Sequence, residues 1–194
     1  MARRIFYFDR PDRFVTGTVG LPGSRTFFLQ AREGERIVSV VLEKVQVAVL
    51  ADRLSLLLDE LGKRGLADTG GAPAARDTEP LDEPLTEMFR AGTLSITWDA
   101  ESSEVTIEAR EQTDEEEAGT DDDAEDAPDV AEIPDDAQDG PDLVRVRLTP
   151  SAARAFAERA ASIVAAGRPP CPFCGEPLDP QGHLCPRRNG NLVN

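Results

Sequence analysis

The chain has 194 residues, of which 40% are hydrophobic and 30% charged, as in a globular protein of one domain with or without a small appendage. No stretch approaches the roughly 18 apolar residues of a membrane span, and the N-terminus lacks the apolar region of a signal peptide. We therefore expect a cytoplasmic protein. The formal net charge of -16 indicates an acidic protein, but the charge is unevenly distributed.

Residues 111–142 hold sixteen Asp and Glu and no Lys or Arg. Of the 37 acidic residues in the chain, 21 therefore remain elsewhere, and they balance the 21 Lys and Arg. A segment so rich in charge cannot bury enough apolar area to offset its ordering entropy. We expect a disordered acidic insert within a nearly neutral folded body.

The first unit of the body, residues 1–66, begins with short apolar runs separated by turn residues. These runs are residues 5–8, 14–19, 26–31 and 37–42. They predict four strands in an antiparallel meander. A period of three and four residues then predicts a helix over the sheet. Its apolar positions are Val47, Leu50, Leu54, Leu57, Leu58 and Leu61.

Residues 67–92 are predicted to be a linker that contains a short amphipathic segment, 81–89. The unit 93–167 follows, and its alternating residues predict a hairpin through 99–103 and a further strand at 144–148. Arg145 and Arg147 are predicted to lie beside Glu104 and Glu108 on neighbouring strands. The acidic insert then connects two neighbouring strands.

Thr149 and Pro150 predict a helix start, with the hydroxyl at the N-cap and proline at the first helical position. The helix ends near Gly167, and its apolar stripe consists of Phe156, Ala160, Ile163 and Val164. The predicted fold class is therefore α+β. It comprises an antiparallel sheet of about seven strands covered by two helices, with an arrangement that favours a degenerate duplication of a β-meander plus helix.

The tail, residues 168–194, contains every cysteine of the chain and its single histidine. Cys171, Cys174, His183 and Cys185 form the pattern C-x2-C-x8-H-x-C. Two thiols on a tight turn, followed by two more soft or borderline donors, are typical of a structural Zn²⁺ site. We therefore expect a zinc-binding tail.

Three alternatives remain open for these residues. The thiols can be incidental in a metal-free tail. Cys171-Pro-Phe-Cys174 is also similar to the glutaredoxin active site, although the prolines and glycines that follow exclude the helix which lowers the thiol pKa in such enzymes. If His183 does not bind, three thiolates would need a fourth donor from water or a partner, and such an open site favours catalysis.

Other signals are weaker. The glycine-rich run 17–23 has the composition of a phosphate loop, but Pro22 and the strand that follows favour a hairpin turn. Arg168, Arg187 and Arg188 give the tail a basic edge, which is either a solvated surface or a contact for a partner. The sequence contains no nucleophile motif, zinc-protease motif or phosphate-binding motif.

Several runs along the chain, Gly-Thr-Val-Gly at 17–20, Phe-Phe-Leu-Gln-Ala at 27–31 and Leu-Glu-Lys at 42–44, resemble an actinobacterial family known only as a domain of unknown function. The most specific part of the resemblance is Ala-Gly-Arg-Pro-Pro-Cys-Pro-Phe-Cys-Gly at 166–175, together with Gly-His-Leu-Cys-Pro-Arg-Arg-Asn-Gly at 182–190. The resemblance implies a cytoplasmic bacterial protein with a zinc-ribbon-like tail, and it implies no activity.

From these features we expect a non-enzymatic protein-binding or adaptor factor with a structural zinc site. A nucleic-acid-associated regulator that uses the basic tail is the alternative. A hydrolase or transferase acting at an open zinc site is the third. The first two differ in their response to salt, because counterion release makes nucleic-acid binding strongly salt-dependent.

Overall fold

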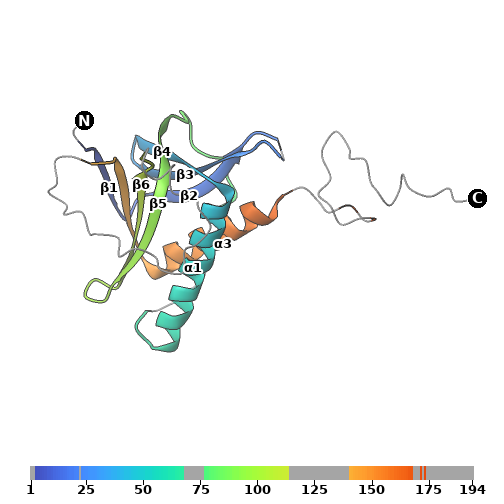
Figure 1. Ribbon diagram of the computed structural model, residues 1–194. Helices are drawn as coiled ribbons and strands as arrows, with labels where there is room; N and C mark the ends of the chain where they lie inside the picture. The colour runs from blue at the N-terminus through green and yellow to red at the C-terminus, as the bar shows by residue number, and fades with distance from the viewer. Residues whose placement is uncertain are drawn as a thin grey trace, which may run out of the picture.

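The computed structural model describes residues 3–21, 23–67, 77–113, 140–167, 171 and 173. It has an α+β fold in which a mixed, mostly antiparallel sheet packs against two helices, which confirms the predicted fold class (Figure 1). The elements are β1 (Ile5–Asp9), β2 (Arg13–Val19), β3 (Thr26–Glu33), β4 (Arg36–Leu42), α1 (Lys44–Lys63), β5 (Glu87–Asp99), β6 (Glu104–Glu111), β7 (Leu143–Leu148) and α3 (Pro150–Ala165).

The sheet contains two antiparallel three-stranded units, β2-β3-β4 and β5-β6-β7. Strand β5 joins them, because its first residues pair in parallel with β4 and its later residues pair with β6. Each unit is followed in the chain by a helix, so the order of three strands and one helix occurs twice. This order agrees with the β-meander-plus-helix pattern expected from the sequence.

The predicted meander of the first four strands is wrong for β1, because β1 does not pair with β2. It pairs in parallel with β7 at the opposite edge of the seven-stranded sheet. Hydrogen bonds from Leu143 N to Arg4 O (2.9 Å) and from Arg10 N to Arg147 O (3.1 Å) continue this pairing. The turn residues between β1 and β2 determine a change of direction, but they do not determine which strands pair.

The short link between β1 and β2 requires a strongly curled sheet. Seven strands about 4.8 Å apart would span roughly 29 Å if flat, whereas the link from Asp9 to Arg13 reaches at most about 14 Å. The two edges therefore approach each other. The Arg36 guanidinium on β4 lies 4.0 Å from the centroid of the Phe8 ring on β1, although three strands stand between β4 and β1 in the sheet order.

One hydrophobic core lies between the inner face of this sheet and the helices. As predicted, α1 buries one stripe, and α3 buries Phe156 and Ala160. The buried residues of α1 are Val47, Leu50, Ala51, Leu54, Leu58 and Leu61. Phe14 on β2 stacks on Phe156, with ring centroids 4.6 Å apart. Burying each such side chain contributes about 1.5 to 3 kcal/mol.

The outer face of β6 and β7 carries the predicted ion pairs. Arg145 Nε lies 2.5 Å from Glu108 Oε1, and Arg147 pairs with Glu104. Thr149 also caps α3 as predicted, because its hydroxyl accepts from Ala152 N at 3.3 Å. Within the part of the chain that the structure describes, no helix has the length and apolar character needed to cross a bilayer.

Candidate functional site

The predicted zinc ligands lie mostly outside the described residues. Cys171 is described, and its side chain is 5% exposed, six residues after α3 ends at Ala165. Cys174, His183 and Cys185 are not described, nor are Arg168, Arg187 and Arg188. Among the described residues, no three His, Cys, Asp or Glu side chains are arranged to hold a metal ion. Three thiols and one imidazole fit the ligand chemistry of tetrahedral Zn²⁺.

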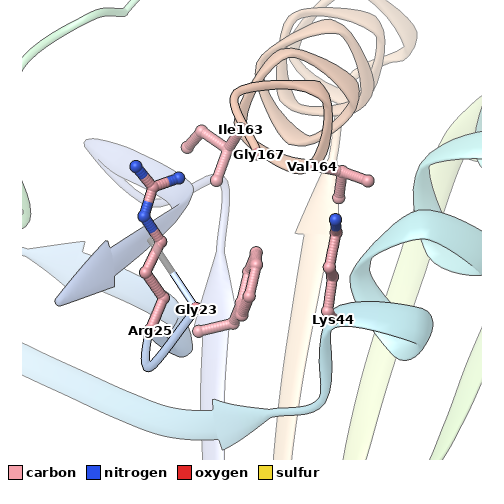
Figure 2. A pocket seen from close by; sticks show the side chains of 7 residues that line it. Gly23, Arg25, Lys44, Ile163, Val164 and Gly167 are labelled. Atoms are coloured by element: carbon pink, nitrogen blue, oxygen red, sulfur yellow. The ribbon is translucent and has the colours of Figure 1, made fainter. Parts of the chain in front are cut away.

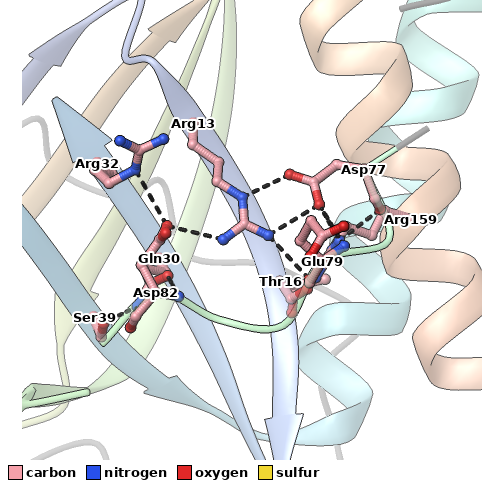
Figure 3. A network of polar contacts seen from close by, with 9 residues as sticks. All are labelled: Arg13, Thr16, Gln30, Arg32, Ser39, Asp77, Glu79, Asp82 and Arg159. Carbon is pink, nitrogen blue, oxygen red and sulfur yellow. Dashed lines mark hydrogen bonds and ion pairs between the residues drawn. The ribbon is translucent and has the colours of Figure 1, made fainter. Parts of the chain in front are cut away.

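A polar network connects the outer face of β2 and β3 to the segment that leads into β5 (Figure 3). The Arg13 guanidinium donates to Asp77 Oδ2 at 2.6 Å and to Asp82 Oδ2 at 2.8 Å. Arg32 Nε also lies 3.3 Å from Asp82 Oδ2, an ion pair without the alignment of a hydrogen bond. Part of the segment expected to be a linker is therefore anchored to the sheet.

Arg159 brings α3 into the same network, and its side chain is buried. Its Nε donates to Thr16 O at 2.8 Å, its Nη1 to Asp77 Oδ1 at 2.7 Å, and its Nη2 to Glu79 O at 2.7 Å. Thr16 belongs to β2, an edge strand of the sheet. Arg159 therefore supplies a donor to Thr16 O, a buried main-chain carbonyl.

The two carboxylates of this network, Asp77 and Asp82, offset most of the charge of its three guanidiniums. The hydrogen bond from Arg13 lowers the pKa of Asp77 and, in return, raises the pKa of Arg13. Burial lowers the pKa of Arg159, although a guanidinium remains cationic at any physiological pH. Because the donors and carboxylates are engaged with one another, we interpret the network as a structural clasp rather than as a binding site.

A second polar feature is a pocket of about 280 Å³ at the C-terminal end of α3 (Figure 2). Three separate segments bring its cations there. Arg25 comes from the turn between β2 and β3, and Lys44 is the first residue of α1. Gly167 is the last described residue before the tail and completes the wall. We call this cavity the basic pocket.

The two cations differ in how they are held. Arg25 Nη1 donates to Ala166 O at 2.7 Å, so the guanidinium caps the end of α3. Lys44 Nζ lies 3.6 Å from the position that a Cβ on Gly167 would take. Among the described residues, neither Arg25 nor Lys44 has a carboxylate within ion-pair distance. The described lining of the pocket therefore carries net positive charge.

The remaining lining of the basic pocket is apolar or glycine. Phe27 is 7% exposed, and Ile163 and Val164 pack against the hydrophobic core. Gly23, with a φ of 102°, lies in the tight turn that presents Arg25. This turn confirms the hairpin predicted for the glycine-rich run, since β2 and β3 pair on either side of it.

The sequence did not indicate this pocket. Arg25 and Lys44 are 19 residues apart, and α3 ends more than a hundred residues further on. Their meeting depends on the tertiary packing of α1 and α3, which no local pattern encodes. The turn-forming residues around Gly23 predicted a hairpin, but they did not predict where the Arg25 side chain would lie.

Comparison with known proteins identifies one family. The model of the family described as "Protein of unknown function (DUF3090)" matches residues 6–185. Neither a curated protein nor a solved structure matches the chain.

Proposed function

We propose a role from the residues of the chain itself, because the chain belongs to this family of proteins of unknown function. It is a non-enzymatic protein-binding factor of the bacterial cytoplasm. It is built as an α+β body with a zinc-binding tail. In this proposal Cys171, Cys174, Cys185 and His183 bind one Zn²⁺. Zinc supplies a tetrahedral cross-link to a segment that is too poor in apolar residues to form a core alone.

The observation that carries the proposal is the position and lining of the basic pocket. It lies where the chain leaves the body for the tail, at Gly167. Its described lining consists of two cations, apolar side chains and glycine, a composition suited to recognition. Within the described lining, Lys44 alone carries a group capable of acid-base or nucleophilic chemistry, and no second such group lies beside it. In this proposal the pocket, and the tail that follows it in the sequence, both contact the partner.

The proposal can be tested by affinity purification from the native host, with zinc retained throughout. We expect the wild-type chain to retain a protein partner and Cys174→Ser to lose it, because the variant lacks one ligand. Arg53→Gln is a matched control, since it removes an exposed charge of α1 outside the pocket. Recovery of the same partner with Cys174→Ser would refute a role for the zinc tail.

One observation favours a nucleic-acid-associated regulator as the second candidate. Gly167 lines the basic pocket, and Arg168 follows it directly in the sequence, so in this candidate Arg25 and Lys44 add to the positive charge of the tail. This candidate predicts binding that weakens steeply with salt. A mobility shift with a random DNA or RNA duplex, repeated at two salt concentrations, distinguishes it from the first candidate.

A further inference from the structure

The basic pocket brings together two cations that lack a carboxylate partner among the described residues. Most arginines of the sheet and helices pair with carboxylates, as Arg13 does with Asp77 and Arg154 with Asp59. Arg25 and Lys44 instead converge on one cavity. Two unneutralised cations repel each other, and an anion between them would remove that repulsion.

Arg25 and Lys44 have more N–H donors than the capping of α3 uses. Arg25 uses one nitrogen on Ala166 O. A guanidinium carries five N–H donors and an ammonium carries three, so most of them are left for a ligand. In Figure 2 both side chains extend toward the end of α3, where Ile163 and Val164 lie. An anion at this position would contact cations and an apolar wall together.

We propose that the basic pocket binds a carboxylate on an apolar stem, supplied by a glutamate-containing segment of a protein partner. The identity of the partner as a protein rests on the proposed function. The apolar wall formed by Phe27, Ile163 and Val164 accommodates the stem, and Arg25 and Lys44 bind the carboxylate. A dianionic phosphate is disfavoured, because the apolar wall would remove water from an anion of higher charge.

The proposal can be tested by titrating the ¹⁵N-labelled full chain with hexanoate while amide chemical shifts are recorded. We expect saturable shifts at Gly23, Arg25, Lys44 and Gly167, with acetate binding more weakly because it lacks the stem. Lys44→Gln and Arg25→Gln should each weaken hexanoate binding by about fivefold, the upper range for a partly exposed ion pair. Arg53→Gln lies about 13 Å along α1 from Lys44 and should not change it.

The peptide acetyl-Leu-Glu-Leu-Glu-amide should shift the same amides, and its glutamine analogue should not. Binding of hexanoate without binding of the peptide would overturn the assignment to a protein partner. Tighter binding of inorganic phosphate than of hexanoate would overturn the carboxylate site. So would Lys44→Gln and Arg25→Gln variants that bind hexanoate as tightly as the wild-type chain. Zinc content measured on the same samples separates failure of the pocket from failure of the zinc tail.

Discussion

Two hydrogen bonds join the Gln30 side chain to the main-chain N–H and carbonyl groups of Asp82. Gln30 Nε2 donates to Asp82 O at 3.0 Å, and Asp82 N donates to Gln30 Oε1 at 2.7 Å (Figure 3). Gln30 is 1% exposed on β3 and also donates to Ser39 Oγ at 3.0 Å. One buried amide therefore attaches the segment that precedes β5 to the outer face of the sheet.

Gln30→Ala should lower the free energy of unfolding by about 3 kcal/mol, because it leaves buried donors and acceptors without partners. Gln30→Leu keeps nearly the same volume, so a similar loss in that variant assigns the effect to hydrogen bonding rather than to a cavity. Urea denaturation measures both values. A loss below about 0.5 kcal/mol in both variants would show that the segment does not depend on this contact.

Gly17→Ala should destabilise the fold by about 1 to 2 kcal/mol, because a Cβ there would lie 2.6 Å from Leu81 Cγ. The prediction depends on Leu81 packing over β2. In a double-mutant cycle, the combined variant Gly17→Ala/Leu81→Ala should therefore lose less than the sum of the two single variants. Strict additivity would mean that the two residues do not touch in solution.

Asp77→Asn should reduce thermal stability at neutral pH, and the difference from wild type should shrink in acid. The folded-state pKa of Asp77 is lowered chiefly by the hydrogen bond from Arg13. The resulting stabilisation is fully present above the unfolded pKa of about 3.9 and is lost as the pH falls through the lower folded pKa. Melting curves from pH 6 to pH 3 measure this difference. A constant difference down to pH 3 would contradict the assignment.

The local features of the fold could be predicted because local physics determines them. Apolar spacing placed the buried stripe of α1, and Thr149 and Pro150 marked the start of α3. Alternation along β6 and β7 placed Arg145 opposite Glu108. Each of these depends on residues that are close in sequence or on neighbouring strands of one unit.

The features that could not be predicted depend on long-range packing. The apolar pattern of β1 suits either edge of the sheet, and only the completed fold selects β7 as its partner. Asp77 and Asp82 looked like polar linker residues because their partners Arg13 and Arg159 come from distant segments. The basic pocket likewise requires three segments to meet.

Replacing residues 114–139 with Asn-Gly should change the melting temperature by no more than about 3 °C. The ends of this segment are already joined, because Glu111 N donates to Asp142 O at 2.8 Å and Asp142 N donates to Glu111 Oε2 at 3.1 Å. Differential scanning calorimetry of both chains makes the comparison. A drop of ten degrees or so would mean that the deleted residues contribute to the folded core.

Metal analysis of the purified chain tests the central claim most directly, since the proposed function depends on a zinc-binding tail. Protein prepared without chelator should contain one zinc per chain. Cys174→Ser should contain little zinc, while its body keeps the wild-type melting transition, because the metal stabilises only the segment that it cross-links. Well under half an equivalent of zinc in the wild-type protein would contradict the account, as would unchanged zinc content in Cys174→Ser.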